Sequence, residues 1–218
     1  MAKHKLHLSL LTLLFSVAAT QQLKAVDITN VNLGTISGAY TTTGTSPNQG
    51  QVLEATFSIA SATNLTIFTD SYGGGTNANG TTATAGGFMP SLVLYSSTGK
   101  YLAGETFPSS IGKKDPVTGL DGDAYLSSIN LAAGTYILAL SDFLVQQPVT
   151  ATNLSDGFIN YGSGTTFTDV QGNLRTGNYS LNLTTSSTPS VPEPATFGLM
   201  IPALVGVAVL VRKRKTAL

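Results

Sequence analysis

The segment Leu53-Glu-Ala55-Thr-Phe57-Ser-Ile59 decides the fold, because an apolar side chain occupies every second position. Successive side chains of an extended strand point to opposite faces, so these residues form one apolar face of a half-buried strand. No comparable stretch shows a helical period. Four further segments alternate in the same way: Leu65, Ile67 and Thr69; Leu92 and Leu94; Tyr136, Leu138 and Leu140; Tyr179, Leu181 and Leu183.

Turn-forming residues separate these segments. Short strands that each carry an apolar face must bury it against a second sheet. We therefore predict an all-β fold, an antiparallel β-sandwich over residues 26–185, and a Ser/Thr/Pro linker over residues 186–191. The breakers are residues 71–80 with four glycines, Thr98-Gly99, Asp115-Pro116, Ala133-Gly134 and Gly177-Asn178.

The charge of the chain is unevenly distributed. The 218 residues have a formal net charge of zero, but residues 26–190 contain ten carboxylates and only four cations, Lys100, Lys113, Lys114 and Arg175. Nucleic-acid binding needs a basic face to meet the phosphates, and none is available there. We therefore expect no nucleic-acid partner.

The residue inventory also restricts catalysis. The chain has no cysteine, and its two histidines, His4 and His7, lie in a segment that we expect to be removed. A Ser-His-Asp triad, a cysteine nucleophile and a His-bound zinc or iron are then excluded from the mature chain. Glu54 and Glu105 could form a glycosidase pair, but no feature of the sequence brings them together. We predict that the protein is not an enzyme and needs no cofactor.

The N-terminal residues have the layout of a secretory signal peptide. Lys3, His4 and Lys5 precede an apolar run from Leu6 to Ala19. Small residues allow cleavage after Ala19 or after Ala25, and we favour Ala25. Residues 1–25 are thus predicted to direct the chain to the secretion translocon and signal peptidase. The alternatives are an uncleaved anchor and a buried core helix.

The C-terminal residues combine a proline-rich tripeptide, an apolar run and a basic tail. Seventeen uncharged residues, Ala195 to Val211, are at the lower limit for crossing a bilayer as a helix. The cations Arg212, Lys213, Arg214 and Lys215 follow and are expected to stay on the cytoplasmic side, which places the sandwich outside. The alternative is a plain single-pass membrane anchor, in which the proline-rich segment only stiffens the junction before the helix.

The last 27 residues, 192–218, resemble the PEP-CTERM sorting signal of exported bacterial proteins. The resemblance rests on Pro192-Glu193-Pro194 standing directly before the apolar run and the terminal basic cluster. It implies that these three residues are read by an exosortase, a membrane-embedded cysteine protease that cuts near them and releases or transfers the protein. It also implies an association with exopolysaccharide, on the cell surface or in the extracellular matrix of a biofilm.

The middle of the chain resembles the bacterial pre-peptidase C-terminal domain, a jelly-roll-like sandwich. Two strands share its Gly-x-Tyr start, Gly134-Thr-Tyr136 and Gly177-Asn-Tyr179, and Pro90 to Gly99 matches its strand and turn. A PEP-CTERM-associated variant of this sandwich is similar at residues 69–75 and 86–88. An unrelated β-sandwich is the alternative, because a tyrosine at the start of a strand is a common core residue in any sandwich.

Asp115, Asp121 and Asp123 crowd a loop that contains glycine, and Asp70 is an additional candidate ligand. Carboxylates in a flexible loop are ligands that Ca²⁺ prefers. The segment lacks the spacing of an EF-hand, and a solvated acidic loop beside Lys113 and Lys114 is the alternative. A calcium site at Asp115, Asp121 and Asp123 is the one metal site that we predict.

Two classes of function follow. The leading one is a non-enzymatic surface or matrix protein, and the alternative is a β-sandwich module that binds carbohydrate or another ligand. Sugar sites usually present exposed aromatic side chains, and the chain has no tryptophan. The tyrosines that could serve instead are Tyr72, Tyr95, Tyr101 and Tyr161.

Overall fold

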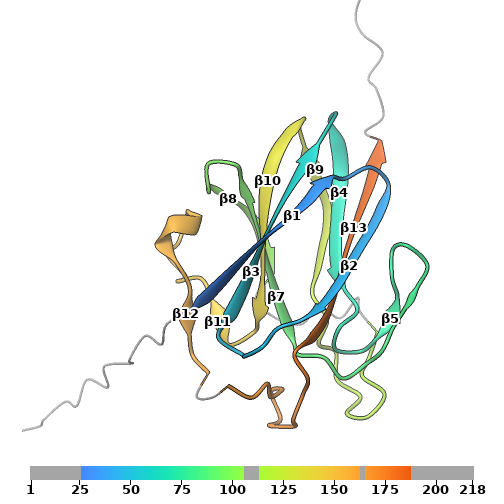
Figure 1. Cartoon of the computed structure of the whole chain (residues 1–218), viewed down its shortest axis with the longest axis vertical. Coiled ribbons are helices and arrows are strands. Elements are labelled where there is room, and N and C mark those ends of the chain that lie inside the picture. Colours follow the sequence, from blue (N-terminus) through green and yellow to red (C-terminus); the bar gives the residue numbers. More distant parts are fainter. Residues whose placement is uncertain (1–25, 106–112, 163–164, 188–218) are drawn as a thin grey trace, which may run out of the picture.

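The computed structural model describes residues 26–105, 113–162 and 165–187, and these residues form an all-β unit. Two sheets pack face to face as a sandwich (Figure 1), which confirms the predicted fold class. The helical content of the described residues is one short 3-10 turn, η1 (Leu154–Asp156).

The sandwich has a five-stranded and a four-stranded sheet. In spatial order the larger contains β1 (Asp27–Thr35), β3 (Gln51–Ile59), β10 (Gly134–Asp142), β7 (Pro90–Ser96) and β8 (Tyr101–Glu105). The smaller contains β2 (Ala39–Thr45), β13 (Asn178–Ser187), β4 (Thr63–Thr69) and β9 (Tyr125–Leu131). Two short hairpins add β5 (Gly75–Thr76) with β6 (Thr82–Ala83), and β11 (Val145–Gln146) with β12 (Ile159–Asn160). Without β1 at its edge, the larger sheet also has four strands, and two four-stranded sheets make up a double-sheet jelly roll.

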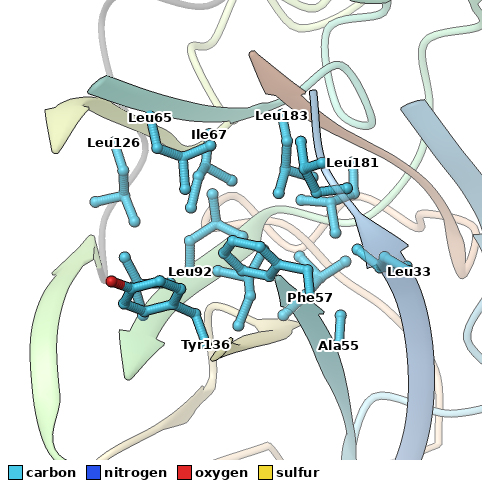
Figure 2. Close-up of a cluster of buried hydrophobic side chains, with 14 of the residues drawn as sticks. Leu33, Ala55, Phe57, Leu65, Ile67, Leu92, Leu126, Tyr136, Leu181 and Leu183 are labelled. Carbon is cyan, nitrogen blue, oxygen red and sulfur yellow. The ribbon is translucent and has the colours of Figure 1, made fainter. Parts of the chain in front are cut away.

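The main core lies between the two sheets. Figure 2 shows Phe57 and Leu92 of the larger sheet facing Leu65, Ile67 and Leu183 of the smaller one. Each of these five side chains is fully buried, and burying one contributes about 1.5–3 kcal/mol relative to leaving it exposed. The five segments with predicted alternation all form strands, and their alternating residues supply most of this core.

A second apolar cluster covers the outer face of the larger sheet. Val52, Val93, Tyr95 and Ala139 point away from the main core and pack with Val145 of β11. The segment from β11 to β12 lies on this face, so β7 is buried on both sides. A strand buried on both faces has no polar alternation, which is why Leu92 to Tyr95 is a continuous apolar run.

The sandwich is not wholly antiparallel, which corrects the prediction. β1 runs parallel to β3, with Asp27 opposite Gln51. The turn after β1 sends the chain into the smaller sheet as β2, and the chain then returns to the larger sheet as β3. Because a complete strand of the other sheet separates β1 from β3, the two can lie parallel, whereas a tight hairpin would have forced them antiparallel.

The last strand is also longer than predicted. Ser186 and Ser187 belong to β13 and pair with Asn64 and Thr63 of β4, so the first two residues of the predicted linker are part of the sheet. The end of β13 therefore lies beside the start of β4. Asp70 follows the opposite end of β4, one strand length of about 20 Å away.

Candidate functional site

The loops at the end of the sandwich remote from Ser187 are held by a buried carboxylate, Asp123. Its Oδ1 accepts hydrogen bonds from the Thr69 hydroxyl at 2.9 Å and from the backbone N–H groups of Ser71 and Tyr72 at 2.7 and 3.0 Å. Its Oδ2 accepts one from the Gly73 N–H at 2.8 Å. Burial raises the pKa of Asp123, and these four hydrogen bonds oppose that rise. Asp123 thus fixes the chain as it leaves β4.

A second buried cluster centres on Arg175, whose side chain is only 6% exposed. Its Nη2 lies 3.0 Å from Oδ2 of Asp115, and its Nε lies 3.3 Å from Oδ2 of Asp169. The guanidinium also lies over the ring of Tyr72, and the Tyr72 hydroxyl donates to Oδ2 of Asp169 at 3.0 Å. One cation therefore joins three loops that are far apart in the sequence.

Hydrogen bonding keeps the two partners of Arg175 charged. Burial raises the pKa of Asp169, but hydrogen bonds from Asn173, Tyr72 and Gln171 outweigh this effect and bring the pKa to about 2. In Asp115 the rise from burial is likewise outweighed, by hydrogen bonds from Arg175 and Thr118, so that its pKa lies below the usual value. Both groups are anionic at neutral pH, as an ion pair with Arg175 requires.

The three carboxylates of the predicted calcium site do not meet. Asp115 pairs with Arg175, Asp121 pairs with the exposed Lys114 at 2.7 Å, and Asp123 binds the backbone of residues 71–73. Across residues 26–105, 113–162 and 165–187, no group of three or more acidic, histidine or cysteine side chains could hold a metal ion. The expected convergence in the loop is therefore corrected to three separate sets of contacts.

Asp70, considered above as an additional ligand, instead lines a polar groove. The groove has a volume of about 330 Å³ and lies between strands β2 and β13 on one side and β6 on the other. Its lining residues include Thr43, Thr45 and Thr82, each of which carries a hydroxyl group. Burial raises the pKa of Asp70 to about 6, with a further rise from Asp123 and an opposing effect of Lys113. We call this space the hydroxyl groove; its other lining residues are Gly44, Ser71, Ala83, Thr84, Asn178, Tyr179 and Ser180.

The β5–β6 hairpin forms one wall of the hydroxyl groove, because hydrogen bonds hold it against the outer face of the smaller sheet. Asn77 in the hairpin accepts hydrogen bonds from the side chains of Ser180 and Asn182. Asn182 also accepts from the Ala78 N–H at 2.9 Å and donates to Oδ2 of Asp70 at 3.3 Å. Polar residues on the outer face of β13 thus fix the wall.

The four candidate tyrosines have different environments. Tyr72 and Tyr95 are fully buried, so neither can present a ring to a sugar. Tyr101 and Tyr161 are 41% and 50% exposed, but neither lines the hydroxyl groove. The aromatic residue that does line it is Tyr179, which was identified from the sequence only as a core residue.

A further buried carboxyl, Asp142, ends β10. Its Oδ1 accepts from the Leu144 N–H at 3.0 Å and from the Gln49 side chain at 3.3 Å, whereas its Oδ2 is buried with no hydrogen-bond partner. Burial raises the pKa of Asp142 to about 7, and the two hydrogen bonds oppose part of that rise. Its sequence context gave no sign of this environment.

The predicted sorting signal lies outside the described residues. This applies to Pro192, Glu193 and Pro194, to the apolar run, and to the basic tail Arg212 to Lys215. The predicted signal peptide also lies outside them. No helix in the described part of the chain is long and apolar enough to span a membrane.

Comparisons with known proteins do not assign a family. No protein-family model matches the sequence, and no curated protein does. Among solved structures, the pre-peptidase C-terminal domain of a collagenase from Bacillus anthracis is 14% identical, with 75% of this chain and 98% of that chain covered and a TM-score of 0.32.

Two further structures have comparable scores. PliG from Aeromonas hydrophila, a periplasmic inhibitor of g-type lysozyme, is 13% identical over 74% of this chain and all of its own, with a TM-score of 0.34. CorA, a surface-associated copper-binding protein from Methylomicrobium album, is 9% identical over 75% of this chain and all of its own, with a TM-score of 0.35. Similarities at this level carry neither a family nor a function to this chain.

Proposed function

We propose that this chain is an exported, non-enzymatic protein of the bacterial cell surface or extracellular matrix, sorted by an exosortase-type protease and associated with exopolysaccharide. In this proposal the signal peptide is removed by signal peptidase, and the membrane helix of residues 195–211 holds the precursor until cleavage near Pro192-Glu193-Pro194. The resemblance of residues 192–218 to sorting signals motivates the sorting step.

One structural observation supports this proposal more than any other. Residues between Asp27 and Ser187 supply both sheets of the sandwich, so cleavage after Ala25 and near Pro192 would leave this unit intact. Val26, the first residue after the favoured cleavage site, packs on the second apolar cluster and would be retained. The mature chain would therefore keep both sheets and both apolar clusters.

The orientation of the sandwich suits display on a surface. β13 ends at Ser187, five residues before Pro192, and the hydroxyl groove lies around the other end of β4. A chain tethered through its C-terminal side would therefore present the Asp123 and Arg175 loops and the groove on the side away from the tether. Loops at the free end of a sandwich are where binding residues are commonly carried.

The test is the cellular location and the length of a chain with an altered Pro-Glu-Pro tripeptide, expressed in the native host. An epitope tag is inserted after the fully exposed Val149, and the wild-type chain is compared with the double variant Glu193→Ala, Pro194→Ala and with the linker control Ser190→Ala. We expect the wild-type and control chains in the surface or medium fraction without their C-terminus. The double variant should stay in the membrane at its uncleaved length. Equal distribution of all three chains would contradict the sorting step.

A further inference from the structure

We infer that the hydroxyl groove is a binding site for a short segment of an uncharged glycan, with the carboxylate of Asp70 accepting hydrogen bonds from sugar hydroxyls. This deepens the proposed function and rests on it only for the source of the glycan, an exopolysaccharide outside the cell. The binding itself depends on the groove alone.

Asp70 supplies a carboxylate acceptor in the lining of the groove. The residue is only 8% exposed, and its Oδ2 accepts the long hydrogen bond from Asn182 at 3.3 Å. Among the described residues, no donor forms a hydrogen bond with its Oδ1. A ligand hydroxyl can donate to this oxygen, and hydrogen bonds to a carboxylate are stronger than those between neutral groups. Gly75 lies against this oxygen, where any larger residue would collide with the carboxylate.

The walls of the groove present neutral hydroxyl and amide groups. Thr43 and Thr45 project from β2, and Thr82 and Thr84 belong to the facing hairpin. The Thr45 hydroxyl donates to the side-chain carbonyl of Asn178 at 2.8 Å, and this hydrogen bond orients the Asn178 amide. Hydroxyls both donate and accept, so these walls suit a ligand that has many hydroxyls of its own.

The charge of the site selects among polar ligands. Asp70 is the one ionisable carboxylate among the lining residues, and no cation lines the groove, so an anionic ligand would be repelled. The polar walls equally disfavour an apolar ligand, which would leave hydroxyls without partners. A volume of about 330 Å³ is at the lower end of the range for small-ligand sites and suits one short segment of a longer chain.

Calorimetric titration of the full chain, purified in a detergent without a sugar head group, provides the test. The probes are oligosaccharides of neutral hexoses, of glucosamine and of uronic acid, each about four units long. We expect a neutral oligosaccharide to bind with a micromolar to millimolar Kd. Asp70→Asn should weaken that binding at least about tenfold and Thr43→Val a few-fold. Thr184→Val is the matched control for Thr43→Val. Thr184 is on the outer face of β13, a strand that contributes to the groove, but it does not line the groove itself, so this substitution should leave Kd unchanged.

Acidification provides a second readout. Protonation of Asp70 removes its charge, so affinity should fall as the pH drops through about 6, and the Asp70→Asn chain should lack this dependence. The charged groups that act on Asp70 are Asp123 and Lys113, and both remain in that variant. The fold of each variant is checked by circular dichroism, and Thr43→Val tests the groove without altering any charge.

Several results would overturn the inference. These are the absence of binding by any neutral oligosaccharide at 10 mM, binding of only the glucosamine or uronate probes, and equal affinities of the wild-type, Asp70→Asn and Thr43→Val chains. None of these results bears on cleavage near Pro192, which is measured separately in the host. Conversely, unprocessed chains in the host would leave the titration result standing.

Discussion

Arg175 stacks on Tyr72, with 3.9 Å between the guanidinium carbon Cζ and the centroid of the ring. The two residues are 103 positions apart, and the carboxylates of Asp115 and Asp169 hold the guanidinium in place. This contact joins the loop after β4 to the segment before β13. Tyr72 directly follows Ser71, which lines the hydroxyl groove, so the contact links the groove to the loops of Asp115 and Asp169.

Replacing Arg175 by methionine should destabilise the domain by about 3–5 kcal/mol, because two buried carboxylates then lose their cation. Urea unfolding of residues 26–187, expressed without either end, measures the change. Lys114→Met is the control, since the pair of Lys114 with Asp121 is exposed and should contribute less than about 1 kcal/mol. Equal effects of the two substitutions would contradict the central role of Arg175.

Asp123→Asn should lower the free energy of unfolding by about 2 kcal/mol or more. The amide retains one oxygen but places an N–H₂ group where Oδ2 now accepts the Gly73 N–H, so a donor would face a donor. The neighbouring substitution Asp121→Asn, which removes a partly exposed ion pair, is the control and should have little effect. If both substitutions prove neutral, the hydrogen bonds to the backbone of residues 71–73 do not stabilise the loop.

Calcium should not stabilise the described domain, because Asp115, Asp121 and Asp123 each have a different protein partner. To bind them, Ca²⁺ would have to displace Arg175 and dismantle the loop. We expect the thermal midpoint of residues 26–187 to be the same in EGTA and in millimolar Ca²⁺. A midpoint that rises with Ca²⁺ and falls back with chelator would restore the site predicted from the sequence.

Stability should fall as the pH rises from about 4 to about 7, because of Asp142 and Asp70. Burial raises the pKa of Asp142 to about 7 and that of Asp70 to about 6, well above the value near 3.9 of an unfolded chain. In that pH window the folded state binds more protons than the unfolded state, so raising the pH favours unfolding. Denaturant unfolding of residues 26–187 at several pH values measures the slope.

The substitution Asp142→Asn separates the two contributions. It should remove the larger part of the slope and raise stability at pH 8, because the amide is neutral and its oxygen can still accept from Leu144 and Gln49. Asp27→Asn, on the exposed edge strand β1, is the control and should leave the slope unchanged. A slope that persists in full in Asp142→Asn would show that Asp142 is ionised in the folded state.

The interior strands of the two sheets were predictable from the sequence, because their apolar residues alternate. The edge strands were not. β2 reads Ala-Tyr-Thr-Thr-Thr-Gly-Thr and has few apolar side chains, since its outer face carries the threonines of the groove and of the hairpin contacts. The parallel pairing of β1 with β3 was also missed. The relative direction of these two strands depends on the chain passing through the other sheet as β2, and the local sequence pattern does not show that.

The site was predictable only in part. Asp70, Asp115 and Asp123 were identified as notable acidic residues, but their partners come from segments about 50 to 110 residues away, which spacing cannot reveal. One signal was available for Arg175, which is the sole arginine between residues 26 and 190 in a stretch with ten carboxylates. A lone arginine in an acidic domain is a good candidate for a buried ion pair, because its planar guanidinium group has enough donors to bind two carboxylates.

The most direct test of export and sorting is the intact mass of the protein recovered from its native host. We predict a chain that begins at Val26, or at Thr20 if cleavage follows Ala19, and that ends between residues 190 and 195. Such a chain would retain every described strand from Asp27 to Ser187. Recovery only of chains that still contain Met1, or that still carry Lys213 and Lys215, would contradict the proposed export and sorting.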